Sequence, residues 1–178
     1  MKLTHLISAG ALVMLAACAA PDQQSARFPS LEAAVASSWQ NLDPAWQKRL
    51  VQDETQKLCS IAKDTPDKAT AERIEKLNQG MKVVYPADGK LVGDWREGEK
   101  LAQSGYGLRV GDNNPNRVNG GNCYACHALD KKELSYGTIG APLTGFAKLR
   151  GYTPEIAKYA YDKIYNAQQF AACSKMPR

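Results

Sequence analysis

The residues with the clearest capacity for chemistry are Cys123, Cys126 and His127, which form a C-x-x-C-H run. Two thiols at this spacing can form thioether bonds with the two vinyl groups of one haem, and the adjacent imidazole can then bind the iron. In an exported protein this pattern is typical of covalent haem attachment. The spacing therefore predicts one haem c, bonded to Cys123 and Cys126, with His127 as an axial ligand of the iron.

Two other kinds of site use closely spaced cysteines. A structural zinc ion needs about four ligands, and without a second C-x-x-C run or a second nearby histidine it would have to recruit Cys59 and Cys173. A thioredoxin-like dithiol belongs in a β-α-β context, which this sequence lacks. Haem attachment is therefore favoured over both.

The opposite face of the iron needs a second ligand, and the mature chain offers few candidates. His5 and the first methionines lie in an export signal, so the thioethers of Met81 and Met176 remain. Met81 precedes the motif, where a methionine usually fills gaps in a core. Met176 lies far downstream of the motif, after an expected helix.

The first residues have the pattern of an export signal. Lys2 precedes the apolar run LISAGALVMLAAC, which is too short to span a bilayer and ends in small residues. The residues up to Cys18 resemble a bacterial lipobox, in which this cysteine becomes the lipidated first residue. Ordinary cleavage near Ala19 or Ala20 would instead remove it. We expect a signal peptide over residues 1–17 and a mature protein in the periplasm, anchored to a membrane if Cys18 is lipidated.

The cysteine count predicts a disulfide. The chain has five cysteines, and once Cys18 and the C-x-x-C pair are assigned, Cys59 and Cys173 remain as an even pair. Exported proteins form disulfides in their oxidising compartment. We therefore expect Cys59 and Cys173 to be bonded.

Composition sets the fold class and excludes one function. The 178 residues carry a net charge of +5 without an arginine-rich run or a basic stripe with interleaved aromatics, so nothing supports nucleic-acid binding. Apolar residues recur at helical spacing with almost no strand alternation, which predicts an all-α fold. We expect helices over residues 44–63, 67–79, 94–104 and 153–166.

These helices fall into two parts. The run Val83–Lys90 contains proline and glycine and predicts a linker between a helical extension, residues 18–84, and a haem domain, residues 85–178. Asp94 and Glu97 have the spacing of a capping box. Gly98 inside that helix suggests a close approach of another helix, because glycine costs about 1 kcal/mol there relative to alanine.

The order of helix, C-x-x-C-H, glycine-rich loop, helix and methionine loop resembles the class I cytochrome c fold. In detail, the segments YPADGKLVGDWREGEKLAQSGYGLR, NGGNCYACHALDKKELSYGTIG, LTGFAKLRGYTPE and YDKIYNAQQFAACSKMPR resemble the monohaem SoxX subunit of the SoxAX cytochromes of bacterial thiosulfate oxidation. The resemblance covers most of the chain from Leu50 onward. It implies that Cys123 and Cys126 form the thioethers, that His127 is the proximal ligand and that Met176 is the distal ligand.

The resemblance also implies partners and a reaction. SoxAX proteins act as L-cysteine S-thiosulfotransferases: they join thiosulfate to a cysteine of a sulfur carrier protein, and two electrons are removed. The catalytic haem belongs to a SoxA-like dihaem or monohaem partner, while SoxX accepts electrons and passes them to a downstream acceptor. An iron with two protein ligands has no open position for substrate, so we expect no catalytic residue in this chain. The alternative is a free-standing periplasmic electron shuttle.

Two features depart from the family pattern. SoxX proteins continue beyond the position of Arg178 with a final helix that packs on the helix bearing Gly98, and we expect that helix to be missing from this sequence. The order of residues from Gly140 to Leu143 also differs from that of many cytochromes c. It leaves Ala141 and Pro142 as alternatives for the carbonyl that orients the histidine ring.

Overall fold

The computed structural model describes residues 30–178, and every regular element in this range is a helix, as predicted for an all-α protein. The described chain divides into two units, one ending at Pro44 and the other covering Ala45–Arg178. None of its helices is both long and apolar enough to cross a membrane. The expected signal peptide and Cys18 lie outside the described residues.

The first unit contains α2 (Leu31–Ser38), which the sequence analysis did not predict. Ser30 caps this helix, because its hydroxyl accepts a hydrogen bond of 3.1 Å from the backbone N–H of Ala33. None of its side chains is buried and its apolar residues do not gather on one face, so the sequence pattern gave little signal.

The single helix expected over residues 44–63 is wrong, because the structure has two helices there, α3 (Pro44–Arg49) and α4 (Glu54–Ile61). Asp53 separates them in an extended conformation with φ −75° and ψ 176°. Its carboxylate accepts from the backbone N–H of Gln56, and the Gln56 side chain accepts from the backbone N–H of Asp53. This reciprocal capping box starts a new helix.

The helix α5 (Lys68–Gln79) matches its prediction closely, with Asp67 as the N-cap. The backbone N–H of Thr70 donates to the Asp67 carboxylate, and this hydrogen bond lowers the pKa of Asp67. On the inner side of α5, Ile74 is fully buried against Cys59 and Cys173. The small apolar cluster of the extension therefore includes a residue from the far end of the chain.

The helix α6 (Trp95–Gln103) begins as predicted at Asp94, but the capping box with Glu97 is wrong. Asp94 accepts from the backbone N–H of Arg96 instead, and the Glu97 carboxylate lies 2.7 Å from Lys100 Nζ. A Cβ atom at Gly98 would have no described atom within 4 Å. The close helix approach expected there is not present among the described residues.

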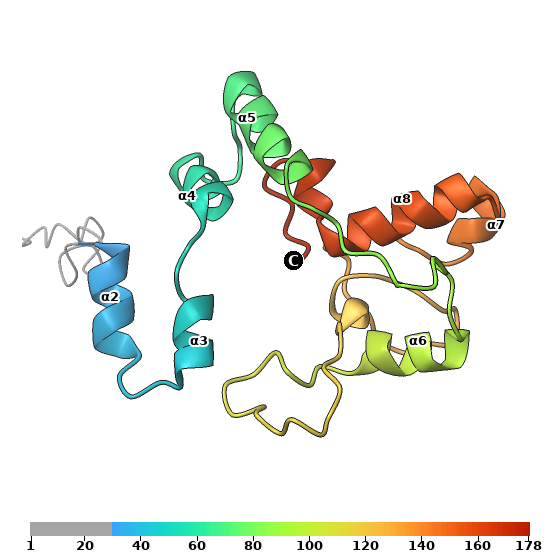
Figure 1. The fold of residues 1–178 in the computed structure, drawn as a ribbon, viewed down its shortest axis with the longest axis horizontal. Helices are drawn as coiled ribbons and strands as arrows, with labels where there is room; N and C mark the ends of the chain where they lie inside the picture. The colour runs from blue at the N-terminus through green and yellow to red at the C-terminus, as the bar shows by residue number, and fades with distance from the viewer. Residues whose placement is uncertain (1–29) are drawn as a thin grey trace, which may run out of the picture. The chain divides into compact units, whose positions relative to one another are not determined.

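The remaining elements are short, apart from one helix. Thr153 caps α8 (Pro154–Tyr165), with Pro154 at its first position, as predicted. Tyr85 donates to Asp162 (2.7 Å) and Tyr161 donates to the carbonyl of Val84 (2.8 Å), so the expected linker is fastened to α8. Figure 1 shows α5 near the segment that follows α8, and residues of the two are in contact. The elements are η1 (Cys123–Ala125), α7 (Phe146–Arg150), α8 (Pro154–Tyr165) and η2 (Ala167–Gln169).

Candidate haem-attachment site

Cys123, Cys126 and His127 lie in one tight turn. The short 3₁₀ helix η1 begins after Asn122, whose φ of 47° is in the left-handed region that asparagine tolerates better than most residues. The backbone N–H groups of Cys126 and His127 both donate to the carbonyl of Cys123, at 3.1 and 2.9 Å. The two thiols are free and half-buried. The structure thus places both thiols and the imidazole on one turn of backbone.

The end of α6 holds this turn from one side. The backbone N–H of Gly121 donates to Leu101 (2.8 Å) and that of Asn122 donates to Ser104 (2.9 Å). A Cβ atom on Gly120 would lie 1.9 Å from the carbonyl oxygen of Ser104, so only glycine allows this approach. The backbone before the motif is therefore fixed by its own hydrogen bonds.

A backbone carbonyl sets the orientation of the His127 ring. Nδ1 lies 2.7 Å from the carbonyl oxygen of Ala141, which resolves the choice between Ala141 and Pro142 in favour of Ala141. A carbonyl oxygen can only accept, so Nδ1 carries the proton and Nε2 keeps its lone pair. Metal-bound histidines typically make such a bond, which fixes the tautomer and raises the basicity of the ligand.

The glycine-rich loop after the motif packs directly against it. The backbone N–H groups of Gly137 and Gly140 donate to Tyr124 and Cys126, both at 2.8 Å. A Cβ atom on Gly137 would lie 1.9 Å from the carbonyl oxygen of Ala125, and one on Gly140 would lie 2.2 Å from Cε1 of His127. These two glycines are needed for space, because a side chain at either would overlap the motif.

We expect the Gly140→Ala variant to displace the His127 ring, because the added methyl overlaps it. Overpacking of this kind costs about 1–3 kcal/mol. Measurement of the free energy of unfolding checks this. Gly93→Ala is the matched control, since its Cβ has no described atom within 4 Å. Equal unfolding midpoints for both variants would contradict the prediction.

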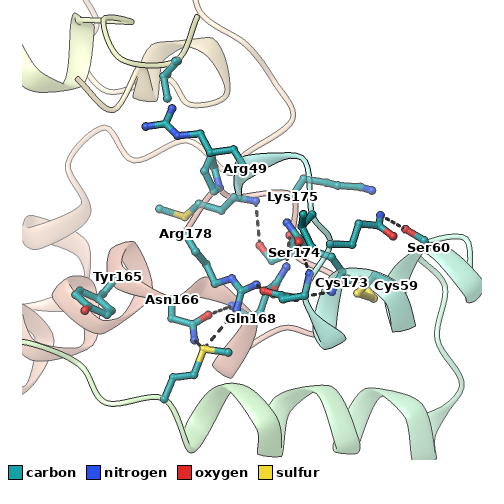
Figure 2. Close-up of a pocket in the computed structure, with 18 of the residues that line it drawn as sticks. Arg49, Cys59, Ser60, Tyr165, Asn166, Gln168, Cys173, Ser174, Lys175 and Arg178 are labelled. Carbon is teal, nitrogen blue, oxygen red and sulfur yellow. Dashed lines mark hydrogen bonds and ion pairs between the residues drawn. A yellow bond between two sulfur atoms is a disulfide. The ribbon is translucent and has the colours of Figure 1, made fainter. Parts of the chain in front are cut away.

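Met176 lies elsewhere, on the wall of an open cavity of about 1230 Å³. Asn119, on the loop that leads to Cys123, also lines this cavity, but Cys123, Cys126 and His127 do not. The volume is large enough for a cofactor. Figure 2 shows this wall around Asn166, Gln168 and Arg178. The structure therefore assembles the C-x-x-C-H turn and places Met176 on a separate cavity wall.

Met81 lines the same cavity, but its sulfur is already engaged. Asn166 Nδ2 lies 3.6 Å and Arg178 Nη1 lies 3.4 Å from the Met81 sulfur. Among the described residues, no donor contacts the sulfur of Met176 in this way. Because a thioether is only a weak acceptor, two donors leave Met81 little capacity to bind a metal. Of the two methionines on this wall, Met176 therefore has the less engaged sulfur among the described residues.

One side chain on the cavity wall is incompletely bonded. Gln168 is 8% exposed, and its amide N–H donates to the carbonyl of Ser174 at 3.3 Å. Its Oε1 atom has no hydrogen-bond partner in the described part of the chain. Burying such an oxygen without a donor costs about 1–3 kcal/mol. The wall of the cavity is therefore polar at this point and suited to a bound group that can donate.

The chemistry of the cysteines disfavours the two alternative sites. Burial raises the pKa of the Cys123 thiol, and the nearby Cys126 adds to this effect, whereas reactive dithiols depend on a lowered thiol pKa. Cys59 and Cys173, which a zinc site would need, are bonded to each other. No group of three or more metal-binding side chains occurs within residues 30–178.

The expected disulfide is present between Cys59 and Cys173, whose Cα atoms are 5.4 Å apart. Both residues are buried, and Cys173 has a φ of 57°, in the left-handed region. Non-glycine residues rarely adopt this conformation unless the surroundings hold them there. The disulfide thus connects α4 to the residues just before Met176.

Sequence reasoning missed three polar residues near this disulfide: Asp53, Asn78 and Arg178. Arg178 forms an ion pair with Asp53 and donates to Asn78 Oδ1 at 3.0 Å. The spacing of Asp53 and Gln56 is a capping signal that could have revealed the start of α4. Asn78 is fully buried, and nothing in the sequence around it indicates a hydrogen bond with Arg178.

Comparison with known proteins gives one informative similarity. No known family model matches the chain. The chain is 33% identical to an uncharacterized lipoprotein of Aquifex aeolicus (strain VF5) over 182 residues, an alignment that covers 97% of this chain and 82% of that protein.

Proposed function

We propose that this chain, which belongs to the same family as the uncharacterized lipoprotein of Aquifex aeolicus, is an exported c-type cytochrome with one covalent haem. The observation that carries the proposal is the C-x-x-C-H turn itself. Its two thiols are free, and the Nδ1 proton of His127 is directed to Ala141, which leaves Nε2 as a ligand atom.

The residues of the C-x-x-C-H turn fit a haem, because two free thiols and an oriented imidazole lie together there, whereas Met176 lies on a separate cavity wall. Cys123 and Cys126 would bond to the haem, His127 would bind the iron, and Met176 would be the second residue to bind it. Leu101, whose carbonyl accepts from Gly121 beside the motif, is 42% exposed, and Leu108, which lines the cavity with Met176, is 49% exposed. An apolar ring could pack against either side chain. When bound, the haem would supply a one-electron iron couple.

The chain's own residues would then hold the iron and exclude other ligands. If His127 and Met176 both bind the iron, it would keep no position for substrate, which favours electron transfer over catalysis. The thioether of Met176 would stabilise ferrous iron and raise the reduction potential. This arrangement is that of a class I cytochrome c, which we propose as the fold of the haem domain.

Location follows from the same family. The relative is a lipoprotein by name, and the present chain has a lipobox-like run that ends at Cys18. We propose that Cys18 is lipidated, and that the protein is anchored to a membrane on its extracytoplasmic side, in the periplasm.

The resemblance to SoxX supports a more specific proposal. The chain would pair with a SoxA-like cytochrome and accept electrons when thiosulfate is joined to a cysteine of a sulfur carrier protein. Co-expression with a SoxA-like chain tests this: recovery of a heterodimer supports it. Recovery of a reducible protein that binds no such chain would instead favour a free-standing shuttle.

Covalent attachment is the first test of the function. In a host with cytochrome c maturation enzymes, we expect the purified protein to retain its haem after denaturation and extraction with acidified organic solvent. The double variant Cys123→Ala, Cys126→Ala should retain none. The matched control replaces the other pair, Cys59→Ala and Cys173→Ala, and should retain the haem, because attachment is measured after unfolding. Complete extraction of the haem from the unchanged protein would overturn the proposal.

A further inference from the structure

The segment that carries Met176, residues 173–178, is bound to the helical extension at several points. We call this stretch the Met176 segment. Cys173 is bonded to Cys59 of α4, and Lys175 pairs with Asp64 just after α4. Arg178 pairs with Asp53 at the start of α4. Met176 therefore lies between two attachments, Cys173 on one side and Arg178 on the other.

These attachments differ in strength. The Lys175 and Asp64 side chains are 61% and 45% exposed, and ion pairs at that exposure contribute little. The Arg178 side chain is only 19% exposed, and its guanidinium has several partners. Hydrogen bonds from a charged donor are about twice as strong as neutral ones. Arg178 is therefore the stronger attachment on its side of Met176.

The partner of Arg178 on α5 is fixed in orientation. Asn78 is fully buried, and its Nδ2 donates to Thr55 Oγ1 at 2.9 Å and to the carbonyl of Ile74 at 2.8 Å. Both of its N–H groups are thus used within the extension. Oδ1 is left facing Arg178, whose Nη1 donates to it at 3.0 Å. A flipped amide would lose the bonds to the Ile74 carbonyl and to Arg178, because neither of these partners can reverse its role.

The same nitrogen also engages the competing methionine. Arg178 Nη1 lies 3.4 Å from the sulfur of Met81, and Asn166 Nδ2 also donates to that sulfur, at 3.6 Å. Figure 2 shows Arg178 and Asn166 near each other on the cavity wall. One guanidinium therefore fastens the Met176 segment and occupies the sulfur of the other methionine that lines the cavity.

We propose that Arg178 is a positioning residue that selects Met176 over Met81 as the sulfur ligand, with Asp53 and Asn78 as its anchors. The inference rests on the proposed function, because it concerns the ligand of the haem iron. It assigns the helical extension a role in the haem domain: α4 and α5 hold the methionine of a segment that follows them by about a hundred residues.

The test compares Arg178→Ala with Lys175→Ala in the haem-loaded protein. Both variants remove a basic side chain from the Met176 segment, but only the first removes the contacts with Asp53, Asn78 and Met81. In Arg178→Ala we expect the sulfur-to-iron charge-transfer band of the oxidised protein to weaken strongly. We also expect imidazole to bind the ferric protein about tenfold more tightly or better, because the competing ligand is held less firmly. Lys175→Ala should resemble the unchanged protein in both measurements.

A milder variant guards against loss of folding. Asp53→Asn keeps a good N-cap for α4 but removes the charge that faces Arg178. It should change the band and the imidazole affinity in the same direction as Arg178→Ala, by a smaller factor.

The outcomes separate the inference from the proposed function. If Met176→Ala loses the band while Arg178→Ala and Asp53→Asn keep both it and the original imidazole affinity, the positioning role is wrong and the cytochrome function stands. If the unchanged protein holds no covalent haem, both fail. A weakened band in Arg178→Ala that is restored by Arg178→Lys would show that charge alone suffices and would overturn the part assigned to the bonds with Asn78 and Met81.

Discussion

Replacing Met176 with alanine is expected to abolish the sulfur-to-iron charge-transfer band of the oxidised protein and to convert much of the iron to a high-spin form. In the proposed cytochrome the iron would lose one of the two protein residues that bind it, and alanine offers no donor atom. Met176→His should keep the iron low-spin but lower the reduction potential, because a second imidazole favours ferric iron more than a thioether does. Axial ligands tune haem potentials over about 0.8 V, so the change should be large. Visible spectra and a redox titration measure both effects.

Met81→Ala is the matched control for this prediction. It removes the same kind of side chain from the same cavity, but its sulfur is engaged by Arg178 and Asn166. We expect the band and the potential of this variant to stay close to those of the unchanged protein. The reverse pattern, in which Met81→Ala loses the band and Met176→Ala keeps it, would show that the ligand has been assigned to the wrong methionine.

Removal of the Cys59–Cys173 disulfide should be the most destabilising change outside the haem motif. The bond closes a loop over a sequence separation of 114 residues, and loss of such a link typically lowers the free energy of unfolding by about 2–5 kcal/mol. The effect should be pronounced here because both cysteines belong to the small buried cluster around Ile74. Urea unfolding of the double variant Cys59→Ala, Cys173→Ala measures it.

Two comparisons isolate the bond from the loss of the sulfur atoms. The unchanged protein unfolded with reductant should approach the stability of the double variant. Cys59→Ala alone should lose as much stability as the double variant, because the remaining thiol has no partner. If the unchanged protein has the same unfolding midpoint with and without reductant, with reduction verified by thiol counting, the disulfide does not stabilise the fold.

Helices with strong local signals could be predicted from the sequence. Asp67 and Thr153 cap helices that begin where the pattern placed them, and both caps act through hydrogen bonds within one turn. The helix expected over residues 44–63 failed, because its apolar spacing continues through Asp53 although the backbone there is extended. Asp53 starts a new helix at a point where the apolar periodicity predicted that one helix would continue. At Glu97 the opposite error occurred, since a carboxylate with the right spacing paired with Lys100 instead.

The sequence by itself determined that two thiols and an imidazole share one turn, and it determined the pairing of the remaining cysteines. The C-x-x-C-H spacing needs only one turn of backbone, and the disulfide followed from the number of cysteines in an exported chain. Only the tertiary structure decided between Ala141 and Pro142, because the answer depends on how the loop folds back onto the His127 ring. The structure alone also showed that Arg178, Asn78 and Asp53 converge, over sequence separations of 100 and 125 residues. Polar contacts between such distant residues leave no periodic trace in a sequence, since each depends on the packing of the helices between them.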